Sequence, residues 1–317
     1  MPLLPTSVMP TAACAAACLA AAVAAWGVWL VRGSTAVPAA VWAVAACLSL
    51  AGEMGTRATG GLTDPAAAAA ARLAVVSLSL CPAMSLLGAK RPQHGVWQLI
   101  VATLAVVLVM PAVSALLMRP GSLPDLHLLE RCFMPLLVFV GWMNFAGTRR
   151  VAAVTCVALG QLILLRGFLP GASLDTRHDV AVSGWDVAAA VLVLAGTLLA
   201  AVQARRGRAA GVAGSERSAR PPLLPAAAID TVFLAIRETF GAAWALRIAE
   251  RFDTVAAARG WPCRLRFGGL EIDGESAVAA AGEPSWQRDA LRAFRSLARR
   301  FVSVDWLARH GWPPAES

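Results

Sequence analysis

Long apolar stretches separated by short polar segments occupy the first two thirds of the chain. A transmembrane helix needs about 20 mostly apolar residues to cross the hydrocarbon core of a bilayer. Seven stretches approach this length, and we expect each of them to form a membrane-crossing helix. They comprise residues 11–31, 36–52, 73–89, 96–118, 132–147, 151–169 and 187–202.

The fifth and sixth stretches lie near the short limit for a membrane span. Only residues 148–150 separate them, which predicts a tight antiparallel helical hairpin. The hairpin can either cross the membrane fully or enter and leave it on the same side. We prefer the full crossing, which gives seven spans.

The first stretch follows no positively charged segment, and further spans succeed it. We therefore interpret it as a retained helix rather than a cleaved signal peptide. Its Ala16, Ala20 and Ala24 form a stripe of small residues, which lets another helix approach closely in lipid. This stripe predicts a central place for the first helix.

The last third of the chain changes character. Residues 204–225 are rich in Gly, Ala, Ser, Arg and Pro without an apolar period, which predicts a flexible linker. Apolar residues then recur at helical spacing in 229–255, and alternating residues flank a Gly-Gly pair in 263–272, which predicts a β-hairpin. The predicted domains are a helical transmembrane domain (1–203), the linker (204–225) and a cytoplasmic α+β domain (226–317).

Composition supports this division. The chain is 58% hydrophobic and 15% charged, whereas soluble domains are nearer half and a quarter, so part of it must lie in lipid. The predicted fold class is mainly α: a polytopic helical membrane bundle of about seven transmembrane helices with a small C-terminal cytoplasmic α+β domain. The net charge of +9 rests on arginine, since Lys90 is the only lysine, and we do not predict a nucleic-acid partner from it.

The distribution of Lys and Arg predicts the orientation. Loops on the inner side of a membrane are enriched in these residues. The basic connections contain Arg32, Lys90, Arg91, Arg149, Arg150 and an arginine cluster within 205–220, whereas the alternate connections mix arginine with Asp and Glu. The first set is therefore expected inside, which places the N-terminus outside and the C-terminal domain in the cytoplasm.

Several polar residues fall within or beside the predicted spans. Glu53 ends the second and Arg72 begins the third, so they are candidates for an ion pair, either structural or part of a gated site. Gln161 lies about ten residues into the sixth helix, roughly 15 Å at the helical rise, and is a candidate for an interhelical hydrogen bond or for lining a cavity. Pro82 and Pro111 would kink two adjacent helices, as in some transporters.

A second group of polar residues gathers at the predicted cytoplasmic face. Asn144 and Arg149 are candidates for binding a ligand there, and Lys90, Arg91 and Arg150 for binding an anionic headgroup. Orientation by positive charge also explains most of these residues.

The predicted helix 285–301 is strongly amphipathic. Its apolar stripe of Trp286, Phe294 and Phe301 faces away from a basic flank. We expect this helix to lie on the membrane surface, with its arginines near anionic lipid headgroups. The alternative is that the stripe completes the core of the domain. The flank consists of Arg288, Arg292, Arg295 and Arg299.

Two segments carry a resemblance to a known family. Residues 81–92 read CPAMSLLGAKRP and precede Trp97, and residues 144–149 read NFAGTR. They resemble the CPP…LGARRP…W and NY-x-x-TR segments of an uncharacterised family of bacterial multi-pass membrane proteins, with phenylalanine in place of the tyrosine. The resemblance implies a bacterial inner-membrane protein and brings no known activity.

No motif for catalysis is present in the sequence. The chain lacks G-x-S-x-G, P-loop and G-x-G-x-x-G patterns, and its four histidines are scattered. We therefore predict no catalytic residue, metal or cofactor, and expect a non-catalytic scaffold or sensor whose partners are the bilayer and its anionic headgroups. The sequence identifies no protein partner. The alternatives are a small-solute or lipid transporter and a membrane-embedded enzyme.

Overall fold

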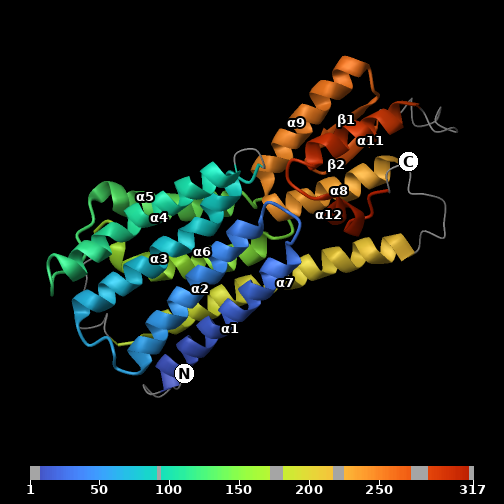
Figure 1. Ribbon diagram of the computed structural model, residues 1–317. Coiled ribbons are helices and arrows are strands. Elements are labelled where there is room, and N and C mark those ends of the chain that lie inside the picture. Colours follow the sequence, from blue (N-terminus) through green and yellow to red (C-terminus); the bar gives the residue numbers. More distant parts are fainter. Residues whose placement is uncertain (1–7, 91–93, 172–180, 217–224, 273–284, 314–317) are drawn as a thin grey trace.

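The computed structural model describes residues 8–90, 94–171, 181–216, 225–272 and 285–313, which form a helical bundle with a smaller module at one end (Figure 1). We call this end of the bundle the proximal end and the opposite one the distal end. The bundle helices are α1 (Val8–Leu30), α2 (Val37–Ala58), α3 (Pro65–Leu87), α4 (His94–Leu117), α5 (Leu128–Met143), α6 (Val151–Leu165) with the 3-10 turn η2 (Arg166–Phe168), and α7 (Gly184–Glu216).

Six helices of the described chain are long and apolar enough to cross a membrane. These are α1, α2, α3, α4, α6 together with η2, and α7. The predicted fifth span is the exception, because α5 has 16 residues. At the helical rise it is about 24 Å long, whereas the hydrocarbon core is about 30 Å thick.

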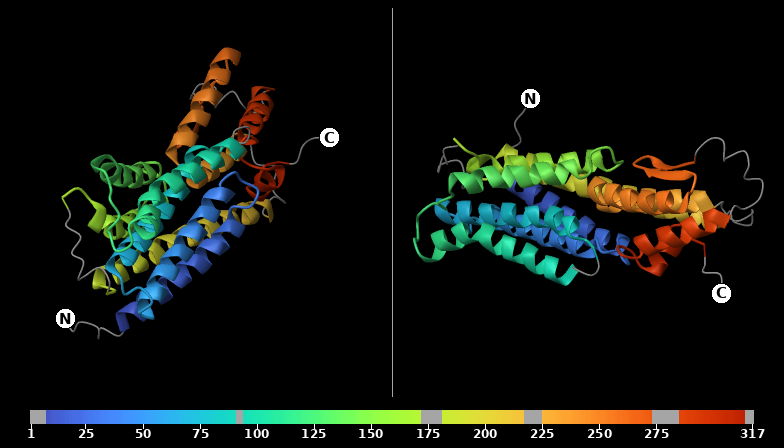
Figure 2. Two further views of the ribbon diagram at one scale, coloured as in Figure 1. Left: turned by 60° about the vertical axis from the view of Figure 1, so that its left-hand side comes forward. Right: turned by 90° about the horizontal axis from the view of Figure 1, so that it is seen from above.

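The bundle helices form a closed circuit. α1 packs against α2 and α7, α7 against α6, and α2 against α3, while α5 contacts both α3 and α6. α4 packs on the outside of α3, and Figure 2 shows the bundle and the module arranged end to end. The outer face of α4 exposes large apolar side chains, including Val96 and Leu99, each 67% exposed. So apolar an exterior suits contact with lipid.

Small residues set the distances between helices. Ala16, Ala20 and Ala24 are buried where α1 meets its neighbours. At Gly196 in α7, an added Cβ would lie 2.6 Å from the Ala153 carbonyl oxygen of α6, so only glycine allows this approach. The prediction of a central first helix is wrong, however. The opposite face of α1 is exposed, with Trp29 at 52%, so α1 lies at the edge of the bundle.

The C-terminal module combines helices with a hairpin. It consists of α8 (Pro225–Phe240), α9 (Ala242–Arg259), β1 (Cys263–Arg266), β2 (Gly269–Ile272), α11 (Ser285–Ala298) and α12 (Val304–Arg309). The strands are antiparallel, with Cys263 opposite Ile272 and Leu265 opposite Leu270, as the alternating pattern predicts. Gly241 separates α8 from α9 at a φ of +85°, a conformation that glycine adopts without strain.

The module has an aromatic core that continues into the bundle. Phe233, Phe240, Phe252 and Phe294 are each 0% exposed. Bundle residues near the proximal end, including Ala36, belong to the same cluster. The module therefore does not form its core alone, because the bundle end supplies one of its walls.

The prediction that the last long helix lays its apolar stripe on the membrane surface is wrong. In α11, Phe294 is fully buried, and Phe301, just beyond its end, is 4% exposed in the module core. Its basic flank faces outward, since Arg288, Arg292 and Arg299 are exposed and Arg295 is half-buried. The apolar stripe is thus already covered, and any contact with headgroups would rest on the arginines alone.

The predicted linker also differs from the structure. α7 has 33 residues and continues to Glu216, so residues 204–216 are helical rather than irregular. Residues 217–224, the rest of that segment apart from Pro225 at the start of α8, lie outside the described part of the chain. The extension is held to its surroundings: Arg208 Nη2 donates to the Trp29 carbonyl at 3.2 Å, and its guanidinium lies 5.0 Å from the centre of that indole ring.

Candidate functional site

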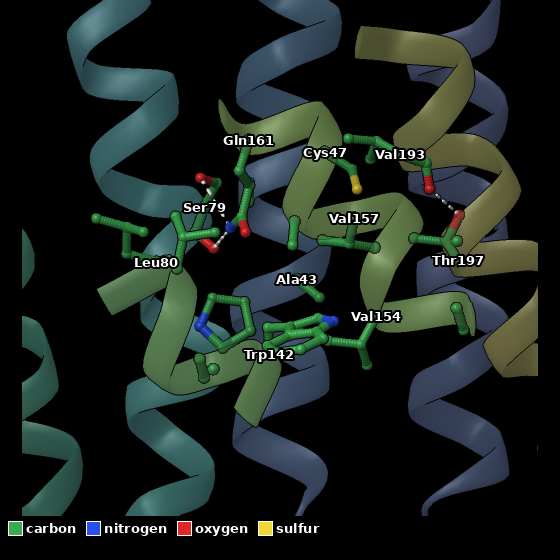
Figure 3. Close-up of a pocket in the computed structure, with 18 of the residues that line it drawn as sticks. Ala43, Cys47, Ser79, Leu80, Trp142, Val154, Val157, Gln161, Val193 and Thr197 are labelled. Carbon is green, nitrogen blue, oxygen red and sulfur yellow. Dashed lines mark hydrogen bonds between the residues drawn. The ribbon is translucent and has the colours of Figure 1, made fainter. Parts of the chain in front are cut away.

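An apolar cavity of about 230 Å³ lies inside the bundle (Figure 3). Side chains of α2, α3, α5, α6 and α7 line it. It runs lengthwise through the bundle, since the α6 residues that line it extend from Ala153 to Leu164. In Figure 3, Cys47 and Val157 point into the cavity from α2 and α6. A cavity lined by such groups favours apolar guests over water.

The cavity exists because small residues line it. Ala43, Ala46 and Ala158 occupy positions where a larger side chain would fill the space. The helices cannot collapse into this space, because other contacts already hold them apart. Gly141 of α5, for example, has no room for a side chain, since an added Cβ would lie 2.9 Å from the Ala83 Cβ of α3.

The polar side chains at the cavity make their hydrogen bonds within the protein. Gln161 Nε2 donates to the Ser79 carbonyl at 2.7 Å and so joins α6 to α3, which is the interhelical role predicted for this residue. Pro82 has no amide hydrogen, so it leaves the Leu78 carbonyl, one residue before Ser79, without its helical donor. Thr197 donates to the Val193 carbonyl of its own helix at 3.0 Å. The cavity therefore presents almost no free polar group to a ligand.

The proximal end of the cavity adjoins the anchors of the module. Leu86 and Phe145 line the cavity. The Leu86 carbonyl accepts a hydrogen bond from Trp244 Nε1 of α9 at 2.8 Å. Asn144, next to Phe145, holds the junction of α8 and α9. The same helix ends therefore face the cavity on one side and the module on the other.

Asn144 is an anchor in this structure. Its Nδ2 donates to the Phe240 carbonyl at 3.0 Å, its Oδ1 accepts from the Ala243 amide at 3.2 Å, and its carbonyl accepts from the Ala242 amide at 2.6 Å. Gly241 lies so close that an added Cβ would collide with the Asn144 side chain. The amide group that the sequence offered to a ligand is therefore engaged by the module.

The basic candidates near Asn144 have different surroundings. The Arg149 backbone amide donates to Glu238 Oε2 at 2.9 Å, while its side chain is exposed. Arg150 is half-buried, and burial lowers the pKa of its guanidinium although Glu238 opposes the shift. Lys90 follows α3 at the edge of the module. Arg91 lies outside the described residues.

A backbone connection strengthens the junction. Ser34, between α1 and α2, forms a β-bridge with Val302. The Ser303 amide donates to the Gly33 carbonyl at 2.7 Å, and Arg309 Nη2 donates to the Arg32 carbonyl at 2.7 Å. Loops at the proximal end thus bind both ends of the module sequence, from α8 to α12.

Buried charges meet at the distal end. Arg72 Nε lies 2.6 Å from Glu53 Oε1, so the two residues paired from the sequence are in contact, and Arg72 Nη1 lies 2.8 Å from Asp186 Oδ1. Arg57 Nη2 lies 2.9 Å from the same Glu53 oxygen. Arg166 reaches Asp186 at 3.6 Å from a more exposed position. This distal charge cluster joins α2, α3, η2 and α7.

Sequence reasoning missed Arg57 and Asp186. Arg57 stands four residues after Glu53, a spacing that places both on one helix face, so a local signal was present. Asp186 had no comparable signal, because 114 residues separate it from Arg72. Among the cavity residues, Gln161 gave a signal as a polar residue deep in a predicted span, whereas the small apolar residues gave none, since such residues occur throughout the spans.

Known proteins provide no further guide to the site. In the described part of the chain, no three His, Cys, Asp or Glu residues gather as metal ligands would.

No protein-family model, curated protein or solved structure matches the chain, so the resemblance of residues 81–97 and 144–149 to an uncharacterised bacterial family stays a prediction.

Proposed function

We propose that this chain is a non-catalytic membrane sensor, in which an apolar chain occupies the bundle cavity and the C-terminal module responds to its presence. One observation carries the proposal: the cavity and the module share helix ends. Leu86 and Phe145 line the cavity, while the Leu86 carbonyl and the adjacent Asn144 hold the module. A guest in the cavity therefore lies one residue away from the anchors.

The lining favours a lipid-like tail as the ligand. The Gln161 amide nitrogen and the Ser79 and Thr197 hydroxyls already donate hydrogen bonds, so a polar guest would lose most of its bonds to water without replacement. The lining residues of α6 from Ala153 to Leu164 span about 16 Å at the helical rise, close to the roughly 15 Å of one leaflet. Acyl or isoprenoid chains have the required shape and polarity.

The proposed setting is a bacterial inner membrane, with the N-terminus outside and the module in the cytoplasm. The arginine-rich connections at the proximal end support this orientation. It requires an odd number of crossings, so α5 would cross as well. Its contacts with α3 and α6 place it alongside spans.

The ligand would act by shifting a conformational equilibrium. A guest can favour one arrangement of α3, α5 and α6 only if it binds that arrangement more tightly than the other. Because Leu86 and Asn144 end two of these helices, a change in their spacing would strain or relieve the junction with α9.

A lipid transporter is the second candidate, and Pro82 supports it. This residue lines the cavity and lies inside α3, where its missing amide hydrogen leaves one carbonyl without a helical donor, as in the discontinuous helices of transporters. The two functions predict different outcomes in vesicles, because a transporter moves lipid between leaflets and a sensor does not. An enzyme is less well supported, since no Asp, Glu, His, Lys or Arg of the described chain lines the cavity.

The test compares two phenylalanine substitutions at neighbouring positions. Ala158 lines the cavity and is 8% exposed, whereas Leu159 is 47% exposed on the outer surface. Purified Ala158→Phe, Leu159→Phe and unmodified protein are extracted with organic solvent, and the extracts are analysed by mass spectrometry. We expect a near-stoichiometric long-chain molecule with the unmodified protein and Leu159→Phe.

With Ala158→Phe we expect at least about a tenfold smaller amount of this molecule, because the phenyl ring fills the cavity. A loss of about 1.4 kcal/mol in binding free energy is enough for a tenfold change. Equal amounts of the same molecule in all three extracts would show that the cavity does not hold it.

A further inference from the structure

A second pocket lies where the module meets the bundle. Its volume is about 280 Å³, and it is separate in position from the apolar cavity. α9 supplies Trp244, Ile248 and two arginines, the end of α11 and the residues after it supply Leu297, Arg300 and Phe301, and Lys90 approaches from the end of α3. We call it the junction pocket.

The junction pocket has an apolar floor and a basic rim. Trp244, Ile248 and Phe301 are 8%, 2% and 4% exposed, so they form its base. Arg247 and Arg251 are exposed and, with Arg300 and the half-buried Lys90, complete the rim. Positions 244, 247, 248 and 251 lie on one face of α9, because their spacing is i, i+3, i+4 and i+7.

The charges of the pocket are unbalanced. Four cations and a single carboxylate, that of Glu250, line it. None of these four cations forms an ion pair with a residue that the structure describes. A cation–π contact positions the Arg247 guanidinium, which lies 5.1 Å from the centre of the Trp244 indole. Excess positive charge above an apolar floor suits an anion attached to an apolar body.

We propose that the junction pocket binds the phosphate headgroup of an anionic phospholipid. Arginine forks match phosphate oxygens, and lysine adds a point charge. Position selects a lipid over a soluble phosphate: Lys90 follows the last residue of α3 by three positions, so the pocket opens at the level where a bilayer that contains the bundle would end. This inference rests on the bundle crossing a membrane and is independent of what the apolar cavity holds.

The experiment uses the full chain in micelles of an uncharged detergent. Thermophoresis measures the apparent Kd for dioleoyl phosphatidic acid, with dioleoyl phosphatidylcholine as the lipid without net charge. The pocket variant is Arg247→Gln with Arg251→Gln. Its control is Arg288→Gln with Arg299→Gln, which removes the same charge from exposed positions outside the pocket.

We expect phosphatidic acid to bind more tightly than phosphatidylcholine, and the pocket variant to weaken its binding at least about tenfold while the control changes it less than about twofold. Equal losses in both variants would overturn the proposal, since they would show attraction to net charge. Equal binding of both lipids would overturn it as well. Displacement of the lipid by millimolar inorganic phosphate would also do so, because the source would then be a soluble phosphate.

A further variant keeps the test decisive if the glutamine variant does not fold. Arg247→Lys with Arg251→Lys retains both charges but loses the fork geometry. We expect it to fold and to bind phosphatidic acid more weakly than the unmodified protein, with a lysine-supported remainder that salt abolishes. Unchanged affinity, or a remainder that salt does not affect, would contradict binding by these arginines.

Discussion

At the distal end of the bundle, a single guanidinium joins three helices. Arg72 of α3 contacts Glu53 of α2 and Asp186 of α7, and its side chain is 8% exposed. Charges buried to this extent are stable only while each has its partners. The distal charge cluster therefore connects the helices, and removing any one of its charged side chains should destabilise the fold.

Replacing Glu53 alone should destabilise the protein strongly, because two arginines pair with its carboxylate. Glu53→Gln leaves Arg72 and Arg57 short of a carboxylate, and we expect a loss of about 3 kcal/mol in the free energy of unfolding. The measurement is thermal unfolding in detergent. Arg166→Gln is the control, since its side chain is 36% exposed and should cost at most about 1 kcal/mol.

The same experiment extends to a double-mutant cycle. Removing both Glu53 and Arg72, each as glutamine, should cost less than the sum of the single losses by about 1–3 kcal/mol. Additive losses would mean that the two side chains do not stabilise each other, whatever their separation.

At the scale of single elements, the apolar period identified the helical face of α11 but not the surface that covers this face. The pattern of α11 identified an apolar face with a basic flank, and this description holds in the structure. The expected partner of that face was lipid, yet Phe252, Trp312 and the rest of the module core cover it. An apolar helix face predicts that something covers it, but not whether lipid or protein does so.

The short helix α12 carries a titratable contact at the junction. His310 Nδ1 donates to the Trp306 carbonyl at 2.8 Å, and its ring stacks on the Trp306 indole at 3.7 Å. Burial lowers the pKa of His310. The positive charges of Arg208 and Arg309 lower this pKa further, and the hydrogen bond to the Trp306 carbonyl partly opposes the shift. The folded protein therefore favours the neutral ring.

This shift predicts lower stability in acid. The unfolded chain binds a proton near pH 6.5, where the folded one does not, so stability is complete above about pH 7 and falls as the pH drops below about 6.5. Thermal unfolding between pH 7.5 and 5.5 measures it. His310→Phe keeps the stacking without a titrating group and should flatten the decline; an identical decline in both proteins would assign it to other groups.

At the scale of the whole molecule, the bundle and the module are one packed unit. Asn144, the Leu86 carbonyl and the bridge between Ser34 and Val302 connect them at separate points. The module core also uses Ala36 of the bundle. A change inside the bundle therefore has a direct physical route to the module.

Removing the Asn144 side chain should loosen this junction. Asn144→Ala leaves the Phe240 carbonyl and the Ala243 amide without their partner, and we expect a loss of about 2 kcal/mol from docking of the module. Hydrogen exchange at the start of α9 should become faster. The control is Met143→Ala, which is 45% exposed, and equal exchange in the two variants would argue against the anchor.

The proposed orientation predicts the outcome of reporter fusions. Alkaline phosphatase inserted between Gly171 and Val182 should be active, because that connection is proposed to lie outside, while a fluorescent protein placed after Glu216 should fold in the cytoplasm. Inactive alkaline phosphatase at the first position, together with fluorescence when a fluorescent protein is placed there instead, would contradict seven spans and would favour a re-entrant pair of α5 and α6.

What the sequence determined by itself is local. Apolar length marked seven candidate spans, of which the structure makes six long enough to cross a membrane, alternation marked the hairpin of β1 and β2, and neighbouring helix ends brought Glu53 to Arg72. Each of these follows from residues close together along the chain, because a helix or strand period is set by near neighbours.

Only the tertiary structure decided the rest. Asp186 reaches Arg72 across 114 positions, Asn144 reaches Phe240 across 96 and Trp244 reaches Leu86 across 158. The cavity likewise depends on which small residues of five helices face one another. No local pattern predicts these pairings, because they depend on which helices are neighbours. That arrangement depends on the surfaces of all the helices together.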